Sequence, residues 1–480
     1  MINVINSITI YSESTLRDAM QAIGEGEIGI SILVEKDTKV FIRTVSDGDI
    51  RRALLQGHGL QNKIEVLSPK QSVSVNQTAK REDINSLFSN VIRIIPCLND
   101  RNQVVDLYFC DSRSNLPVAR PYFDDEEIAM VNECIVSGWV SSGGKFVTEF
   151  EEMVAKKCSR KHAIASSSGT SALHLALLAM GISKGDEVIV PTLSFIASAN
   201  AITYTGAKPV FVDSDFKTWN IDPVEVEKAI TSKTKAIMPV HLYGHPADMD
   251  EINELAEKYN LLVVEDAAEA QGATYKERPV GSLGAVATFS FFGNKVITTG
   301  EGGMIVTDDD QIASKCRILR DHGMSADKRY WHPELGFNYR MTNLQASIGV
   351  AQMRKFDWII EKKKKIALKY ISELFGVKGI GLPPNEAWAD NVYWLFTILI
   401  DEEEFGASVS ELSDVLKSNE IDTRPIFYPI HTQPIYSREM DCPNAEKIHQ
   451  MGLSLPSSPD LRSDDIRRTC EIIKSTVKNI

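Results

Sequence analysis

The sequence predicts an α/β protein whose largest domain is built on a mostly parallel β-sheet. Downstream of Pro117, short apolar runs alternate with helical stretches, a pattern typical of buried parallel strands. A length of 480 residues also exceeds that of one ordinary domain and allows two to four. We expect the sheet to contain the runs His162–Ala165, Glu187–Val190, Pro209–Val212, Ala236–Met238 and Leu261–Val264.

The first 113 residues follow a different rhythm, in which a set of helices and strands is repeated after about fifty residues. The first set consists of a helix at Leu16–Ile23, strands at Gly29–Val34 and Val40–Thr44, and a helix at Asp47–Gln56. The second, weaker set consists of Lys80–Phe88, Val91–Pro96 and Val104–Phe109. Because residues 111–115 are predicted to form a linker, we expect a separate N-terminal domain at residues 1–113.

The C-terminal part departs from this alternation. We predict a long helix from about Asn343 to Leu374, a strand at Tyr393–Ile400 and a helix at Val409–Asn419. The run Glu361–Lys365 is the one basic cluster, and we expect it on the solvated face of the long helix. The rest of the chain is thus divided into a large domain at residues 117–350 and a smaller α+β subdomain at residues 351–480.

Composition argues against several classes of protein. With 43% hydrophobic and 24% charged residues the chain is expected to be globular, and a net charge of −13 argues against non-specific nucleic-acid binding. The sequence has neither a membrane-spanning apolar stretch nor the features of a signal peptide, so we expect a cytoplasmic protein. The seven cysteines are scattered and form no CxxC pair, which argues against a disulfide framework or structural zinc.

Three segments of the predicted large domain carry candidate chemistry. The first is Ser166–Ser171, a loop rich in Gly and hydroxyl residues that precedes the apolar helix Ala172–Met180. Backbone N–H groups at a helix N-terminus attract anions, so this loop could hold a phosphate. An ordinary Ser/Thr N-cap explains the same residues.

The second segment places Asp266 just beyond the buried strand Leu261–Val264, at the end of the sheet where open α/β folds bind ligands. A desolvated carboxylate needs a cation or several donors as its partner, and a protonated pyridine nitrogen would serve. An acid that caps the following helix is the alternative.

The third segment contains Lys295, which follows an aromatic-rich strand and is flanked by glycines. Apolar surroundings lower the pKa of an amine, as a lysine that forms a Schiff base requires. A lysine that snorkels from the edge of the sheet is the alternative. A phosphate anchor, a strand-end acid and such a lysine, in this order, are the three anchors that pyridoxal phosphate needs.

Residues from Pro117 to the C-terminus resemble the DegT/DnrJ/EryC1/StrS family of sugar aminotransferases. The resemblance rests on the segment from Ser290 to Met304, which contains Lys295, and on the segment from Thr423 to His431. It implies the fold type I architecture of pyridoxal-phosphate enzymes. It also implies transfer of the amino group of glutamate to C4 of a nucleotide-linked 4-keto-6-deoxy sugar. GDP-4-keto-6-deoxymannose and UDP-linked keto-sugars are both candidates.

The resemblance further implies roles for individual residues. Lys295 and Asp266 are the expected catalytic residues. The expected cofactor contacts are Gly169, Thr170, Ser171 and Ser290 at the phosphate, Phe195 on the ring, Asp266 at the ring nitrogen, Glu269 at the ring hydroxyl, and Asn338 reaching the site of the neighbouring subunit in a dimer. Substrate contacts are expected from Trp139, Trp331, His332, Arg340 and His431, with packing or structural roles as the alternative. Dimers could also pair into tetramers.

Residues 1–113 resemble a tandem pair of CBS motifs, a regulatory module of the Bateman type. The match is best at Arg43–Leu54, where Ser46 and Asp49 would contact the phosphate and ribose of a nucleotide. The second repeat lacks the corresponding Ser/Thr-x-x-Asp pattern, so at most one nucleotide site is expected. A purely structural or dimerising module is the alternative.

Two other functions are compatible with this fold. Related sugar 3-dehydratases replace the cofactor-binding lysine by histidine, so Lys295 argues against that reaction. A nucleotide-sensing protein with an inactive catalytic half is the second. The presence of Lys295, Asp266 and Ser290 together argues against it.

Overall fold

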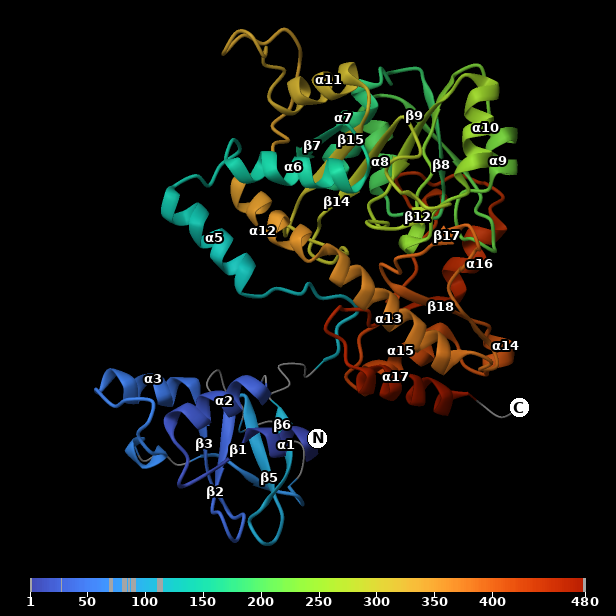
Figure 1. Cartoon of the computed structure of the whole chain (residues 1–480). Helices are drawn as coiled ribbons and strands as arrows, with labels where there is room; N and C mark the ends of the chain where they lie inside the picture. Colours follow the sequence, from blue (N-terminus) through green and yellow to red (C-terminus); the bar gives the residue numbers. More distant parts are fainter. Residues whose placement is uncertain are drawn as a thin grey trace. The chain divides into compact units, whose positions relative to one another are not determined.

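The computed structural model describes residues 2–26, 28–68, 72–79, 84, 87, 92–109 and 115–477. The chain divides into two compact units, Met1–Ser114 and Asn115–Ile480, and each is described by itself (Figure 1). No helix in the described part of the chain is long and apolar enough to cross a membrane.

The N-terminal unit contains two three-stranded sheets with the same pairing pattern. In each sheet the central strand is parallel to the first strand and antiparallel to the third. The strands are β1 (Thr9–Tyr11), β2 (Ile30–Val34) and β3 (Phe41–Ser46) in one sheet, and β4 (Val75–Asn76), β5 (Ile94–Leu98) and β6 (Val104–Phe109) in the other. The helices are α1 (Ile2–Ile8), α2 (Leu16–Gly26) and α3 (Asp47–Leu55). The helix predicted at Lys80–Phe88 lies mostly outside the described residues.

The second unit is centred on a seven-stranded mixed sheet of order β7-β15-β14-β11-β10-β8-β9. The pairings of β15 with β7 and with β14 are antiparallel, and the other pairings in the sheet are parallel. The strands are β7 (His162–Ser166), β8 (Glu187–Pro191), β9 (Lys208–Val212), β10 (Thr234–Ile237), β11 (Leu262–Asp266), β14 (Val286–Ser290) and β15 (Gly303–Thr307). All five strands predicted from the apolar runs are confirmed.

Helices surround this sheet (Figure 1). They are α5 (Asp125–Ser137), α6 (Lys145–Lys157), α7 (Gly169–Ala179), α8 (Ala197–Tyr204), α9 (Pro223–Ala229), α10 (Met249–Tyr259), α11 (Asp310–Arg320) and α12 (Asn343–Arg354). Helix α7 packs against β14 and β15 and is buried along much of its length, which explains why its sequence is apolar on nearly every side.

A smaller four-stranded sheet, of order β16-β18-β20-β19, organises the C-terminal part. Its strands are β16 (Ile380–Gly381), β18 (Phe396–Ile400), β20 (Gly452–Leu455) and β19 (Arg424–Pro425). The helices are α13 (Phe356–Leu374), α14 (Glu402–Phe405), α15 (Val409–Ser418), α16 (Pro443–Met451) and α17 (Ser463–Thr476). A third small sheet joins β12 (Thr274–Tyr275), β13 (Arg278–Pro279) and β17 (Ala389–Asp390).

The prediction of one uninterrupted helix from Asn343 to Leu374 is wrong at Lys355. There the chain turns between α12 and α13, and the Lys355 amine forms ion pairs with Asp124 at 2.6 Å and Glu127 at 2.9 Å. Both acids lie at the start of α5, so the break brings the lysine to a cluster of acids far away in the sequence.

The parallel strands direct several loops to one edge of the large sheet. Asp266 ends β11, and a parallel bridge between Val240 and Asp266 continues the pairing beyond the end of β10. The loops after β8 and β10 end at the same edge, because parallel neighbours share their direction. This edge is where the sequence places the candidate acid.

The expectation that the whole basic run Glu361–Lys365 is solvated is wrong at Lys363. This side chain lies on the inner face of α13 with 4% of its surface exposed, and its amine donates to the Ser457 carbonyl at 2.8 Å. Burial lowers the pKa of Lys363 to about 7. Helical spacing explains the exception, since Ile359, Ile360, Ile366 and Ala367 are buried on the same face.

Lys363→Met should stabilise the protein at neutral pH. The unfolded amine keeps its proton up to about pH 10, whereas the folded amine loses it above about pH 7. The wild-type free energy of unfolding should therefore rise between these pH values, and the gain from the substitution, on the order of 3 kcal/mol at pH 7, should shrink toward pH 10. Urea unfolding at both pH values measures it, with exposed Lys362→Met as the control. If the free energy of unfolding depended on pH equally in wild type and Lys363→Met, the lowered pKa of Lys363 would be contradicted.

Candidate active site

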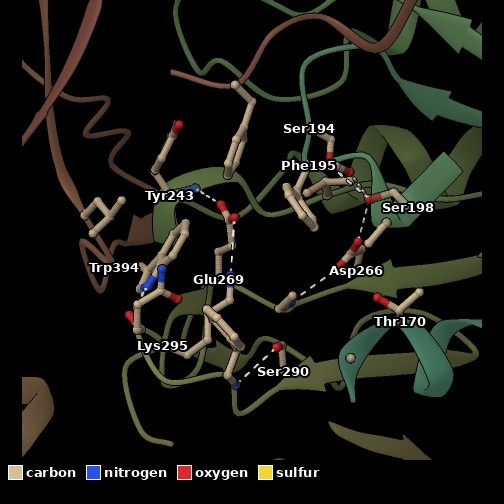
Figure 2. Close-up of a pocket in the computed structure, with 18 of the residues that line it drawn as sticks. Thr170, Ser194, Phe195, Ser198, Tyr243, Asp266, Glu269, Ser290, Lys295 and Trp394 are labelled. Carbon is tan, nitrogen blue, oxygen red and sulfur yellow. Dashed lines mark hydrogen bonds and ion pairs between the residues drawn. The ribbon is translucent and has the colours of Figure 1, made fainter. Parts of the chain in front are cut away.

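A cavity of about 370 Å³ opens at the edge of the large sheet where β11 ends (Figure 2). It combines the N-terminus of α7, the loops after β8, β10, β11 and β14, and the C-terminal segments around Trp394 and Phe427. Seven of the predicted cofactor contacts line it: Gly169, Thr170, Phe195, Asp266, Glu269, Ser290 and Lys295. The structure thus brings together residues spread over more than a hundred positions of the sequence.

The N-terminus of α7 forms one side of the cavity. Ser168 is the N-cap, and its side chain accepts from the Ser171 N–H at 3.1 Å. A Cβ on Gly169 would lie 2.8 Å from the Cβ of Ser290, so only glycine allows the hydroxyl of Ser290 to approach this helix end. Ser171 does not line the cavity. Its hydroxyl accepts from the Ser168 N–H at 2.9 Å in the capping box and lies 2.7 Å from the hydroxyl of Ser166.

Asp266 is a buried carboxylate that faces this cavity, with 4% of its surface exposed. The Ser198 hydroxyl donates to Oδ2 at 2.7 Å and the Ala268 N–H donates to Oδ1 at 3.2 Å. Burial raises the pKa of Asp266, while these donors and the charge of Lys295 oppose the rise. No cation of the described residues lies within ion-pair distance. A positively charged group in the cavity, such as a protonated ring nitrogen, would complete its environment.

Lys295 follows β14 and directs its amine into the same cavity. Its Nζ lies 3.4 Å from Oε1 of Glu269 and 3.7 Å from the centre of the Trp394 ring. Burial lowers the pKa of Lys295, and the charges of Glu269 and Asp266 oppose the fall. Removal from water thus favours the neutral amine, which is the form that acts as a nucleophile. The two acids favour the protonated form.

Glu269 is the second buried acid of the cavity. The Tyr243 N–H donates to Oε2 at 2.9 Å, while Oε1 faces Lys295. Burial raises the pKa of Glu269, and the charge of Lys295 lowers it. The carboxylate is thus held from one side by the backbone and from the other by the lysine (Figure 2).

Sequence reasoning missed several residues that line the cavity. Tyr243, after β10, has its ring stacked between Trp394 at 5.8 Å and Phe427 at 5.5 Å. The rule that ligands gather beyond parallel strand ends could have identified Tyr243 and the Asp266 partner Ser198. Trp394 and Phe427 follow no such rule, because only tertiary packing brings the C-terminal segments to this edge.

The predicted substrate contacts do not line the cavity of this chain. Trp139 and Trp331 are exposed, at 60% and 57%, and Asn338 and His332 are exposed as well. Arg340 forms an ion pair with Asp321 at 2.8 Å.

His431 is buried, with one ring nitrogen 2.7 Å from Thr192 Oγ1 and the other 3.1 Å from Glu446 Oε1. Its environment therefore fits the structural alternative.

The predicted nucleotide contacts of the N-terminal unit lie at the start of α3. Asp49 Oδ2 accepts from the Ser46 N–H at 3.0 Å, and Ser46 Oγ accepts from the Asp49 N–H at 3.3 Å, which makes a capping box. Arg52 donates to the other carboxylate oxygen at 2.6 Å, and Arg43 lies 3.5 Å away. In this arrangement both residues stabilise the helix end.

Comparisons with known proteins agree with this site. The model of the DegT/DnrJ/EryC1/StrS aminotransferase family matches residues 121–474. The chain is 47% identical over 359 residues to GDP-perosamine synthase of Escherichia coli O157:H7, covering 75% of this chain and 97% of that protein. It is 49% identical over 364 residues to GDP-perosamine synthase of Caulobacter vibrioides, covering 74% and 97%.

Solved structures give the same relationship. DesV of S. venezuelae matches with a TM-score of 0.71 and 36% identity, covering 75% of this chain and 99% of DesV. DesI, solved with its TDP-sugar product, matches with a TM-score of 0.72 and 31% identity, covering 77% and 94%. The matched part contains every residue of the cavity. The chain is therefore a pyridoxal-phosphate-dependent sugar aminotransferase, and it belongs to the DegT/DnrJ/EryC1/StrS aminotransferase family.

Proposed function

We propose that the protein transfers the amino group of glutamate to C4 of GDP-4-keto-6-deoxymannose and so produces GDP-perosamine. The similarity to two GDP-perosamine synthases over nearly their whole length carries this proposal. The cavity agrees with it, because a buried lysine, a strand-end acid and a helix N-terminus converge there. We further propose that it acts in the cytoplasm, in the synthesis of a surface polysaccharide such as O-antigen.

The cavity offers a partner for each part of the cofactor. Gly169, Thr170 and Ser290 would hold the phosphate at the N-terminus of α7, and Phe195 would cover the ring. Asp266 would bind the ring nitrogen and keep it protonated, since the buried carboxylate has no ion pair of its own within the described structure. When bound, pyridoxal phosphate supplies an aldehyde for amine exchange and a ring that accepts electrons.

Lys295 would perform the proton transfers of both half-reactions. Its Nζ would take the proton from the α-carbon of glutamate and later return one to C4 of the sugar. The Lys295 amine would gain and lose a proton during the reaction, and the carboxylate of Glu269 lies 3.4 Å from it. The resemblance places Glu269 at the ring hydroxyl, a position where many family members carry Gln or His, and here it would hold the lysine in the cavity as well.

We propose a homodimer with shared active sites. Asn338 and Arg340 lie outside the cavity of their own chain, as do the exposed Trp139 and Trp331. Exposed aromatic residues of this kind are typical of interaction surfaces. In the dimer, Asn338 would reach the phosphate in the neighbouring subunit, and the other three residues would contact the sugar nucleotide there.

The N-terminal unit would be a CBS-pair module. The repeated strand pattern of its two sheets supports an internal duplication. Regulation by a nucleotide at Ser46 and Asp49 stays a prediction. The capping box and the two arginines around Asp49 instead favour a structural or dimerising role. Pairing of dimers into tetramers through these modules stays a prediction as well.

The purified protein should convert GDP-4-keto-6-deoxymannose and glutamate to GDP-perosamine and 2-oxoglutarate. A UDP-linked 4-keto-6-deoxy sugar should react at least ten times more slowly in kcat/KM, because recognition of the base discriminates by more than about 1.4 kcal/mol. Chromatography of the products measures both reactions, with Lys295→Ala as the inactive control. Faster amination of the UDP-linked sugar would reject the proposed substrate and keep the aminotransferase.

If the active sites are shared, the activity of a heterodimer should depend on whether two substitutions lie on the same subunit or on different subunits. A heterodimer of Lys295→Ala and Asn338→Asp subunits retains one native site, so it should show about half of the wild-type activity. A heterodimer of wild type with the double variant has a defect in each site and should be nearly inactive. Differently tagged subunits allow both heterodimers to be purified and assayed. Half activity in the second heterodimer would show that Asn338 serves its own subunit.

A further inference from the structure

Trp394 contacts the cofactor-binding lysine in two ways. Its Nε1–H donates to the carbonyl of Asn294, the residue before Lys295, at 2.7 Å. Its ring face lies 3.7 Å from the Lys295 amine (Figure 2). The indole therefore restrains both the backbone and the tip of the same lysine. It is itself buried, with 3% of its surface exposed.

The segment that carries Trp394 packs against the loop after β10. The Trp394 N–H donates to the Tyr243 carbonyl at 3.0 Å, and the two rings stack at an interplanar angle of 13°. Tyr243 and Tyr393 both adopt left-handed backbone conformations, with φ of 52° and 50°. Such conformations cost free energy in residues other than glycine and persist only where their surroundings impose them.

The same loop also holds the acid that faces the lysine. The Tyr243 N–H donates to Glu269 Oε2, whose partner oxygen lies 3.4 Å from Lys295. The amine is thus surrounded by the Trp394 ring, Glu269 and, at longer range, Asp266. An ammonium group over an indole face is attracted most strongly when both are shielded from water.

We propose that Trp394 is a positioning residue, whose ring face holds the Lys295 amine in its protonated form and in reach of Glu269. A segment of the C-terminal subdomain would then control the protonation and the position of a lysine that belongs to the large domain. The proposal uses the assignment of Lys295 as the cofactor-binding amine, but its effect is present without cofactor.

The test is the pH dependence of Lys295 acetylation in the cofactor-free full-length protein. Acetic anhydride modifies the neutral amine. Mass spectrometry of the Lys295 peptide at each pH gives the pH at which acetylation is half-maximal, called the midpoint below. Trp394→Leu removes the ring face and should lower the midpoint by about 0.5 to 1 pH unit. Trp394→Phe keeps an aromatic face but loses the N–H donor, so its midpoint should fall by less than half as much.

Trp388→Leu is the matched control. Trp388 is a half-buried tryptophan of the same subdomain, packed against His245 at 5.3 Å and Tyr275 at 5.1 Å and outside the cavity. Its loss should leave the midpoint of Lys295 unchanged. The substrate assay separates this proposal from the proposed reaction, because acetylation needs neither substrate nor cofactor.

An unchanged midpoint in Trp394→Leu, or an equal fall in Trp388→Leu, would overturn the role of Trp394. Melting curves of each variant identify any that fails to fold. If Trp394→Leu is one of them, a midpoint in Trp394→Phe equal to the wild-type value overturns the proposal. A measurable fall of less than 0.5 unit in that variant supports it.

Discussion

The site depends on a buried cluster of opposite charges at the edge of the large sheet. Lys295, Glu269 and Asp266 are all largely removed from water, and each would be costly to bury alone. The lysine is stabilised by the two acids, and the acids by the lysine and by backbone or hydroxyl donors. Asp266 has no ion pair within the described part of the chain, so a cationic group, such as a protonated ring nitrogen, would complete the cluster.

Rigid backbone elements hold this cluster in place. Asp266 is the last residue of a buried parallel strand, and Lys295 follows a strand paired with it through Asp266 and Thr288. Gly169 permits α7 to approach Ser290 at a distance that no side chain would allow. The acid, the lysine and the helix end that would hold the phosphate are therefore fixed by the sheet, which is the kind of preorganisation that catalysis needs.

The sequence was sufficient to predict the elements that repeat a regular pattern. The five parallel strands and the strand-end Asp266 follow from apolar runs, and Lys295 follows from its flanking glycines and aromatics. The break at Lys355, the burial of Lys363 and the position of Trp394 could not be predicted. Each depends on contacts with residues distant in the sequence, such as Glu127, Ser457 and Asn294. The surroundings of His431 could not be predicted for the same reason, because its partners Thr192 and Glu446 come from other segments.

Whether Lys295 binds the cofactor is tested most directly by borohydride reduction of the purified protein loaded with pyridoxal phosphate, followed by peptide mapping. Reduction makes the bond between cofactor and amine permanent, so the modified lysine can be identified by mass. The site described here predicts a phosphopyridoxyl group on Lys295 and none after prior treatment with glutamate, which removes the amine from the cofactor. Modification of another lysine, or none at Lys295, would contradict the assignment of the active site.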